Sequence, residues 1–172
     1  KFTDPGSQDI SLVAISDRNC LDSTTYQVFI YENPTANFVA DTVCFNSIET
    51  SFDGSISTLG DPNSSINNWS WNFGDLNSPF NELFSSNSNP THLYTSPGIF
   101  EVSLIIEDNL GCSDTTENFI RVWNNPIANF FSDTVCFGDE TNFIGFSSIG
   151  DANITSWSWN YGDFSGNIIE FD

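Results

Sequence analysis

Hydrophobic and polar side chains alternate along several short stretches of this chain. Residues 100–107 read Phe-Glu-Val-Ser-Leu-Ile-Ile-Glu, so every second side chain from Phe100 to Ile106 is apolar. A period of two predicts a β-strand with one buried face. Residues 108–111 (Asp-Asn-Leu-Gly) predict a turn, and the alternation that follows predicts a second strand, with Ile120 and Val122 near its end. The same pattern occurs earlier in the chain, at Ile10, Leu12 and Ala14 and then at Val28 and Ile30.

A third alternation predicts the central strand of the fold. It places Trp69, Trp71 and Phe73 on one face, and Gly74-Asp75 ends the strand. Prolines and glycines within residues 89–98 mark corners of the chain. No stretch keeps the 3.6-residue period of a helix, and turn signals separate the short predicted strands. The sequence therefore predicts an all-β fold, most economically a β-sandwich.

The chain repeats itself at a fixed spacing. Pro5, Cys20 and Phe38 each recur 92 positions later. Residues 41–45 recur at the same spacing, and residues 69–75 recur 88 positions later as residues 157–163. A period of this length is too long for a solenoid and suits a row of small domains. We therefore expect a tandem array: residues 1–33 are the C-terminal part of one repeat, residues 34–125 a complete repeat, and residues 126–172 the N-terminal part of a further repeat.

Short linkers marked by proline separate the predicted repeats, at Asn33-Pro34 and Asn125-Pro126. Proline narrows the conformations that a linker adopts. We therefore expect neighbouring repeats of the same chain to be partners of one another. Each repeat should add roughly 35–45 Å to a rod, because strands rise about 3.3 Å per residue and end loops add to their length.

The composition supports a compact fold and excludes some partners. Five Trp and 17 Phe supply enough apolar surface for a core. Asp and Glu number 23 against three Lys and Arg, so the formal net charge is −20. Such a chain repels nucleic acid and anionic membrane surfaces, and no apolar run is long enough to insert into a bilayer. We expect neither nucleic acid nor direct membrane insertion.

The order of motifs resembles the polycystic-kidney-disease (PKD) domain. Residues 69–75 read Trp-Ser-Trp-Asn-Phe-Gly-Asp, residues 89–94 read Asn-Pro-Thr-His-Leu-Tyr, and a proline-glycine corner, an alternating strand and Gly111-Cys112 follow. The resemblance implies tandem Ig-like β-sandwiches whose core signature is Trp69, Trp71, Phe73, Gly74 and Asp75. Leu76 and Phe164 stand where the family usually has glycine, which implies a different turn after the signature.

Two further motifs narrow the resemblance. Residues 135–138 (Val-Cys-Phe-Gly) and 111–115 (Gly-Cys-Ser-Asp-Thr) are similar to those of long PKD arrays in surface proteins of gliding Bacteroidetes bacteria, which the type IX secretion system exports. This implies a structural or adhesive segment of an extracellular, cell-surface filament or gliding adhesin, with a polysaccharide or another surface as partner. The alternative is a carbohydrate-binding accessory module of a secreted hydrolase, with a ligand-contacting aromatic such as Phe80 or Phe84.

The sequence contains few residues that are suited to catalysis. His92 is the single histidine, and a packing role at a strand end accounts for it. Asp75 and Asp163 each follow a glycine, where a carboxylate commonly accepts backbone N–H bonds. We therefore expect no enzyme and no cofactor. Calcium is the one weak exception. Carboxylate oxygens are available as ligands, although they lack the dense spacing of a known calcium motif, at Asp61, Asp75, Asp151 and Asp163.

Four cysteines occupy matching positions of the repeats, without the Cys-x-x-Cys spacing of a zinc site. Disulfides of an exported protein fit this pattern better. In one pairing Cys44 bonds Cys112, which keeps each repeat self-sufficient; in the other, each bonds a cysteine of a neighbouring repeat. We favour the first, but both stay open. Cys20 and Cys136 are expected to have partners outside the chain.

Asp-(Ser/Thr) motifs recur near the cysteines. They place Ser23, Thr42, Thr115 and Thr134 in predicted surface turns. The motifs resemble the O-glycosylation signal used on exported proteins of the same bacterial group, which implies a glycoprotein. Glycans at these places would shield strand ends from proteases and from edge-to-edge association.

Overall fold

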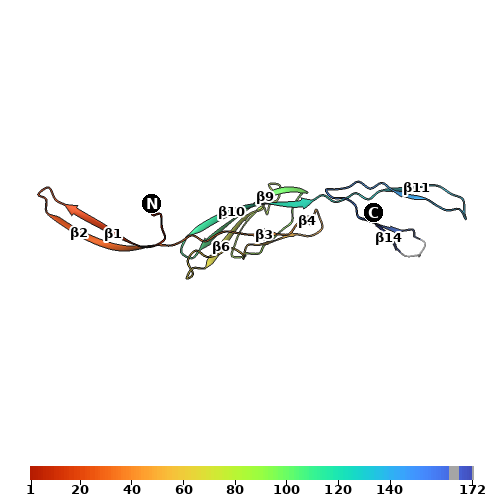
Figure 1. Cartoon of the computed structure of the whole chain (residues 1–172). Coiled ribbons are helices and arrows are strands. Elements are labelled where there is room, and N and C mark those ends of the chain that lie inside the picture. The colour runs from red at the N-terminus through yellow and green to blue at the C-terminus, as the bar shows by residue number, and fades with distance from the viewer. Residues whose placement is uncertain (163–166, 172) are drawn as a thin grey trace.

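The structure is a computed structural model, which describes residues 1–162 and 167–171. Three regions lie in line (Figure 1): an N-terminal hairpin (residues 1–30), a middle region (31–123) and a C-terminal region (124–162 and 167–171). All the regular elements in the described residues are β-strands, so the predicted all-β class is confirmed. In this part of the chain no helix is suited to crossing a membrane.

The strands follow one another in this order. The N-terminal hairpin contains β1 (Gly6–Ile15) and β2 (Leu21–Ile30). The middle region contains β3 (Val39–Ala40), β4 (Val43–Cys44), β5 (Thr50–Asp53), β6 (Ile66–Asn72), β7 (Glu82–Ser85), β8 (Thr91–His92), β9 (Gly98–Asp108) and β10 (Ser113–Trp123). The C-terminal region contains β11 (Phe130–Ser132), β12 (Phe143–Gly145), β13 (Ser156–Asn160) and β14 (Asn167–Phe171).

The middle region is a sandwich of two sheets. One sheet has the strand order β4-β10-β9-β6-β7, and the other has the order β3-β5-β8. Neighbouring strands run antiparallel, except that β4 pairs in parallel with the end of β10, at Val43↔Val122 and Cys44↔Trp123. The β-sandwich predicted from the alternating pattern is therefore present in this region.

The core lies between the two sheets and follows the predicted alternation. Along β9, the side chains of Val102, Leu104 and Ile106 are fully buried, and the residues between them lie at or near the surface. Phe52 of β5 contacts Trp71 of β6 from the opposite sheet, with ring centroids 5.5 Å apart. Strand β9 thus has the single buried face that a period of two requires.

The signature strand β6 agrees with the sequence prediction only in part. Trp71 and Phe73 are each 1% exposed, whereas Trp69 is half-buried at the margin of the core. The facing sheet consists of strands of two to four residues, so it covers the centre of β6 better than its beginning. Gly74 follows the strand with a φ of +72°, a conformation that favours glycine.

The N-terminal hairpin has the sequence of a β9–β10 hairpin, but no sheet formed by the described residues faces it. Strands β1 and β2 pair from Gly6↔Ile30 to Ile15↔Leu21, and they correspond to β9 and β10 at the spacing of 92 residues. Leu12 is 67% exposed, whereas the equivalent Leu104 is 0% exposed. The apolar face of this hairpin is therefore open to solvent.

The C-terminal region repeats the aromatic packing of the middle region. Phe130 and Trp159 meet edge to face at 5.4 Å and 77°, and the equivalent Phe38 and Trp71 meet at 5.2 Å and 74°. Phe143 is equivalent to Phe52, and Tyr161 is equivalent to Phe73. The contact between Phe143 and Tyr161 therefore repeats the contact between Phe52 and Phe73. Strands β11 and β12 pair as β3 and β5 do, and β13 and β14 pair as β6 and β7 do.

Candidate functional site

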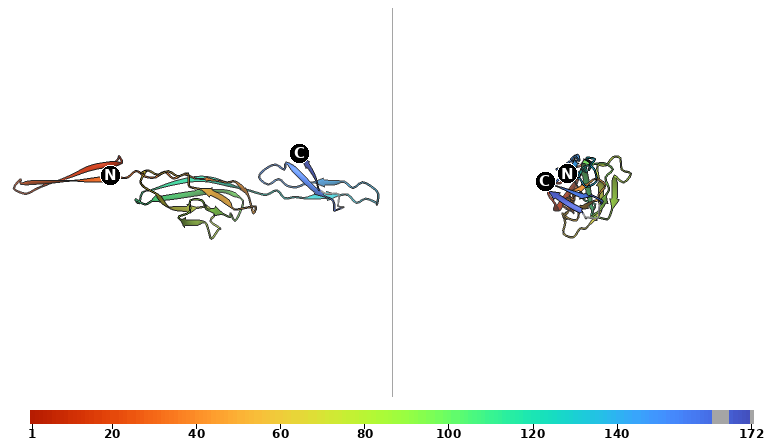
Figure 2. Two further views of the ribbon diagram at one scale, coloured as in Figure 1. Left: turned by 90° about the horizontal axis from the view of Figure 1, so that it is seen from below. Right: turned by 90° about the vertical axis from the view of Figure 1, so that its right-hand side faces the viewer.

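Two short joints connect the three regions, which lie end to end in the views of Figures 1 and 2. The first joint consists of residues 31–35 and the loop 57–61 of the middle region. Thr35 N donates to the Thr58 carbonyl at 2.9 Å, and Thr58 N donates back at 3.0 Å. Gly60 lies so close to the linker that a Cβ atom there would overlap the carbonyl oxygens of Glu32 and Asn33. The linker is therefore packed against the loop.

The second joint has the same construction, with residues 123–127 and the loop 147–151 of the C-terminal region. Ile127 N donates to the Ser148 carbonyl at 3.1 Å, and Ser148 N donates back at 3.0 Å. A Cβ atom on Gly150 would overlap the carbonyl oxygen of Asn124. Two bonds are added here, because Asn124 N donates to Asp151 Oδ2 at 2.7 Å and Asp151 N donates to the Asn124 carbonyl at 3.4 Å.

Further hydrogen bonds tie both linkers to the middle region. At the first joint, Ala36 N donates to Asp114 Oδ2 at 2.8 Å. At the second joint, Asn125 Nδ2 donates to the Phe45 carbonyl at 2.7 Å, and Phe45 N donates to the Trp123 carbonyl at 2.8 Å. The first linker is thus packed against Gly60 and bonded at its end, and the second is bonded at residues 123–125 and 127, which restricts swivelling between the regions.

The sequence analysis missed the role of Gly60 and Gly150. It noted their loops only as positions of the acidic candidates Asp61 and Asp151. Neither glycine has a positive φ, so neither serves the conformational role that turn glycines have. Both are needed for close approach of another backbone instead. The sequence does contain one signal for this role: a glycine occurs at the same loop position in both repeats. A tight turn alone does not require glycine at that position.

The calcium candidates do not come together in the structure. Asp61 Oδ1 accepts hydrogen bonds from Asn63 within its own loop, while Asp75 and Asp151 each accept backbone N–H bonds elsewhere. Asp163 lies outside the described residues. Within residues 1–162 and 167–171, no group of three or more His, Cys, Asp or Glu side chains is placed to hold a metal ion.

Asp75 holds the corner between the signature and the strand β9. Its Oδ2 accepts the backbone N–H of Thr95 at 2.8 Å, and its Oδ1 accepts the Thr95 hydroxyl at 2.7 Å. His92 Nε2 lies 3.5 Å from Oδ2. Burial raises the pKa of Asp75, but the bonds from Thr95 and His92 outweigh it and lower the pKa below its ordinary value.

His92 completes the corner as a neutral packing residue. Its ring stacks on Phe73 at 4.4 Å and meets Tyr94 edge-on at 4.7 Å, and burial lowers its pKa more than Asp75 raises it. Tyr94 in turn donates its hydroxyl to the Phe73 carbonyl at 3.1 Å. His92 and Asp75 both lie beneath the surface, so the pair has no access to a substrate in this structure.

The cysteines do not pair within the middle region, so the favoured Cys44–Cys112 disulfide is wrong. Cys44 lies beside Trp123 at the end of β10, whereas Cys112 directly precedes the first residue of β10. Strand β10 has 11 residues, so roughly 35 Å separate its ends at about 3.3 Å per residue. A disulfide needs Cα atoms within about 7 Å. All four cysteines, Cys20 and Cys136 included, are free thiols here.

The glycosylation candidates are all exposed, but only two of them lie in connections. Thr42 lies between β3 and β4, and Thr134 follows β11. Ser23 and Thr115 lie within β2 and β10, paired with Val13 and Ile105. The prediction that all four lie in turns is therefore wrong for these two, because the hairpin strands begin earlier than the motifs suggested.

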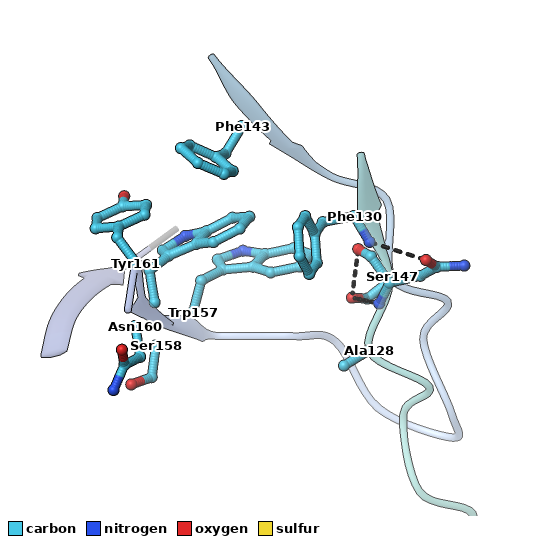
Figure 3. A pocket seen from close by; sticks show the side chains of 10 residues that line it. Ala128, Phe130, Phe143, Ser147, Trp157, Ser158, Asn160 and Tyr161 are labelled. Atoms are coloured by element: carbon cyan, nitrogen blue, oxygen red, sulfur yellow. Dashed lines mark hydrogen bonds between the residues drawn. The ribbon is translucent and has the colours of Figure 1, made fainter. Parts of the chain in front are cut away.

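An open hollow of about 400 Å³ lies over the aromatic side chains of the C-terminal region. Figure 3 shows Phe130 of β11, Phe143 of β12 and Trp157 of β13 around it, together with Tyr161, which directly follows β13. Among the residues that line it, Tyr161 alone carries a titratable side chain. In the middle region the equivalent rings Phe38, Phe52, Trp71 and Phe73 are buried, and β9 and β10 extend the sheet beside β6, so the hollow has the character of an incomplete core.

Comparison with protein families identifies the fold. Residues 31–122 match the family model described as the PKD domain. The match covers more than half of the chain, and the chain therefore belongs to the PKD domain family. No curated protein matches the chain significantly.

Several solved structures are similar to this chain. The PKD1 domain of Vibrio anguillarum Epp is 27% identical, with 54% of this chain and 95% of that one covered and a TM-score of 0.42. The PKD1 domain of the Vibrio cholerae metalloprotease PrtV is 28% identical, with 52% and 96% covered and a TM-score of 0.39. Carbohydrate-binding modules of a β-sandwich superfamily are 24% identical, with 66% and 53% covered and a TM-score of 0.45.

Proposed function

We propose that this chain is a run of tandem PKD domains, with boundaries near Pro34 and Pro126, that serves as a structural and adhesive segment of a long extracellular repeat protein. The observation that carries the proposal is the repeated construction of the two joints. Backbone bonds link Thr35 with Thr58 and Ile127 with Ser148 in the same way, and a glycine receives the linker at both places. Such joints set each domain at a fixed angle to the next and let a row of them bear tension.

The finer proposal is a cell-surface filament or gliding adhesin exported by type IX secretion, with a polysaccharide or a solid surface as its partner. Its support is the resemblance of residues 111–115 and 135–138 to such arrays. The net charge of −20 keeps parallel filaments apart by repulsion. In this role the chain has no catalytic part, and the buried Asp75–His92 pair stabilises the domain.

The positions of the cysteines and of the glycosylation motifs are consistent with this role. Cys44 lies at the second joint, because Phe45 and Asn125 beside it are bonded there. Cys112 lies in the turn between β9 and β10, where Asn109 and Ser65 exchange hydrogen bonds close to the loop of the first joint. We propose that each forms a disulfide with a neighbouring repeat beyond this chain, and that Ser23, Thr42, Thr115 and Thr134 carry O-linked glycans in the native protein.

Gly60→Ala should loosen the first joint. The added Cβ overlaps the Glu32 and Asn33 carbonyl oxygens, so the linker must leave the loop. We expect small-angle X-ray scattering of the monomeric chain to show a shorter maximum dimension and a broader distance distribution. The urea midpoint of the middle region should change little, because residue 60 lies outside the core.

Gly138→Ala is the matched control. Residue 138 has a positive φ of 97° but nothing within 4 Å of its Cβ position, and it lies in neither joint. Its scattering profile should match that of the unchanged chain. Equal profiles for all three proteins would mean that the joints are flexible already, and a structural role that depends on stiff joints would be excluded.

One exposed aromatic favours a second candidate, carbohydrate binding as an accessory module. Phe80, in the connection between β6 and β7, is 76% exposed, as a ring that stacks on a sugar has to be. Phe84, the other residue considered from the sequence, lies within strand β7. A solvent-facing ring on a loop is the usual place for such a contact.

Phe80→Ala should weaken binding to any polysaccharide that retards the unchanged chain in affinity electrophoresis. Phe119→Ala is the control, because Phe119 is also well exposed but lies on β10. A loss of roughly 5- to 150-fold in affinity is expected if the ring supplies about 1–3 kcal/mol, as aromatic rings do when they stack on nucleobases. Equal retardation of both variants, or none with any polysaccharide tested, would exclude the accessory-module function at this position.

A further inference from the structure

An open hollow of about 290 Å³ lies at the first joint, where the N-terminal hairpin meets the middle region (Figure 1). Side chains from both regions line this joint hollow: Phe29, Tyr31, Asp61, Asn63 and Leu110. Phe29 belongs to β2 and Tyr31 follows that strand, whereas the other three belong to two loops of the middle region. The joint hollow therefore needs both regions in their present arrangement.

The two rings of the joint hollow lie on the face of the hairpin that stays open to solvent in a complete domain. Phe29 and Tyr31 are 53% and 42% exposed. At the spacing of 92 residues they are equivalent to Arg121 and Trp123, which lie outside the core of the middle region even though its second sheet is present. Val122, between these two, is the residue that points into that core. The joint hollow therefore does not depend on a missing sheet.

Hydrogen bonds hold the polar walls of the joint hollow in place. Asp61 Oδ1 accepts the backbone N–H of Asn63 at 2.8 Å and its side-chain amide at 3.2 Å. Just beyond this loop, Ser65 N donates to Asn109 Oδ1 at 2.8 Å and Asn109 N donates to the Ser65 carbonyl at 2.9 Å, which ties the loop to the turn that carries Leu110. A site that is formed in advance loses little conformational entropy when a ligand binds.

The side chains of the joint hollow suit a sugar ring. The rings of Phe29 and Tyr31 are inclined at 57°, with centroids 5.0 Å apart, and offer an apolar wall against which the C–H groups of a sugar pack. The carboxylate of Asp61 accepts hydrogen bonds from hydroxyl groups, and the amide of Asn63 both donates and accepts them. A ligand with an apolar face and hydroxyl groups around its rim matches both parts of the wall.

Charge and size narrow the ligand further. Asp61 is the only charged side chain among the residues that line the joint hollow, and the chain as a whole carries a formal net charge of −20. Phosphate, sulfate and carboxylate groups are therefore repelled. A volume of about 290 Å³ is at the lower end of ligand pockets, so it takes roughly one sugar ring and not a folded protein.

We propose that the joint hollow binds one ring of a neutral polysaccharide, with Phe29 and Tyr31 against its apolar face and Asp61 and Asn63 bonded to its hydroxyl groups. This inference rests on the adhesive role proposed above and assigns the polysaccharide a place on the chain. The place differs from that of Phe80, which lies in the connection between β6 and β7. Because the bound ring contacts both regions, it also stabilises the joint in its present arrangement.

The second joint carries the same positions with one decisive difference. Trp123 stands at the position of Tyr31, but Arg121 stands at the position of Phe29. The guanidinium carbon of Arg121 lies 4.3 Å from the centroid of the Trp123 ring, so one face of the indole is covered by the chain itself. We therefore expect sugar binding at the first joint to exceed that at the second. Phe29→Arg should copy the covered state at the first joint, in a form that the chain already accepts at the second.

Affinity electrophoresis of the full chain tests this site, in gels that contain laminarin, hydroxyethyl cellulose or galactomannan, against a gel without polysaccharide. We expect at least one of these neutral polysaccharides to retard the chain, and the acidic alginate to leave it unretarded. Phe29→Arg and Tyr31→Ala should each weaken binding by roughly fivefold or more, the effect of losing one stacked ring. Tyr26→Ala is the matched control, because Tyr26 is an exposed tyrosine of β2 that does not line the joint hollow. It should be retarded as the unchanged chain is.

Asp61→Asn tests whether the ligand is hydroxylated. The variant keeps an oxygen that accepts the N–H of Asn63, so the loop is retained, but it removes the negative charge. Hydrogen bonds to a charged group are roughly twice as strong as neutral ones, so we expect binding to weaken by about fivefold. An apolar ligand would bind this variant equally well or more tightly, and that result would overturn the assignment to a sugar.

Gly60→Ala tests whether both regions contribute to the site. This variant loosens the first joint and leaves every residue that lines the joint hollow unchanged, so it should bind more weakly than Gly138→Ala, which lies in neither joint. Equal binding by the two variants would overturn a site that the regions share.

The proposal is also overturned if no neutral polysaccharide in the gels retards the chain, or if Phe29→Arg and Tyr31→Ala are retarded as the unchanged chain is. In the latter case polysaccharide binds elsewhere on the chain and the adhesive role stands without this site. The structural role is tested separately, because the scattering of Gly60→Ala is measured without any polysaccharide.

Discussion

Replacement of Trp71 by alanine should lower the free energy of unfolding of the middle region by roughly 3–5 kcal/mol. Trp71 is 1% exposed and lies among three other rings, with Phe38 at 5.2 Å, Phe52 at 5.5 Å and Phe73 at 6.2 Å. Removal of the indole leaves a cavity at the point where the two sheets meet, and the surrounding rings are held by their own strands. Such a cavity closes only in part.

Urea unfolding followed by far-ultraviolet circular dichroism measures this loss without depending on tryptophan emission. Trp69→Ala is the informative comparison. Trp69 lies two residues before Trp71 on the same face of β6, but it is half-buried. It should lose clearly less stability than Trp71→Ala, and Phe119→Ala on the exposed face of β10 should change it by about 0.5 kcal/mol or less. Equal losses for the two tryptophans would contradict the position of the core.

The difference between these tryptophans shows what a periodic pattern determines. Alternation fixes which face of a strand a side chain lies on, and for β9 this correctly predicts Val102, Leu104 and Ile106 in the core. It contains no information on how far the opposite sheet extends. Trp69 and Trp71 therefore look equivalent in sequence, although the short strands β3, β5 and β8 cover them unequally.

The packing at the joints and the distance between Cys44 and Cys112 could not be predicted from the sequence for a related reason. Whether Cys44 and Cys112 are close depends on the direction of β10, and β4 joins its far end through a parallel pairing that no local pattern encodes. Gly60 is needed because another backbone passes against it, which is a long-range contact. The repeat itself was readable, because identical residues at a fixed spacing require no knowledge of the fold.

Replacement of Asp75 by alanine should cost roughly 2–4 kcal/mol, because it removes a buried carboxylate that accepts both the N–H and the hydroxyl of Thr95. The matched control is Thr95→Val, which removes the hydroxyl alone and keeps the backbone bond. It should cost about 1 kcal/mol. Both values come from urea unfolding at pH 7. An effect of Asp75→Ala no larger than that of Thr95→Val would show that the carboxylate is dispensable.

The same corner should make the domain sensitive to acid in two stages. The pKa of His92 is lowered from 6.5 by burial, so the unfolded chain binds its proton first and stability falls as the pH drops below about 6.5. The pKa of Asp75 is lowered from 3.8 despite burial, mainly by the bonds from Thr95, so a further loss begins below about pH 3.8 and continues down through the folded pKa. Above pH 6.5 both contributions are fully present.

Variants separate the two stages, in urea unfolding measured between pH 3 and pH 8. His92→Gln should remove the loss of stability that begins below about pH 6.5 and leave the loss that begins below about pH 3.8. Asp75→Ala should remove the lower stage and deepen the upper one, because the carboxylate that raises the pKa of His92 is then absent. An unchanged slope in His92→Gln near pH 6 would contradict a neutral, buried His92, and the acid loss would then belong to the other carboxylates of this acidic chain.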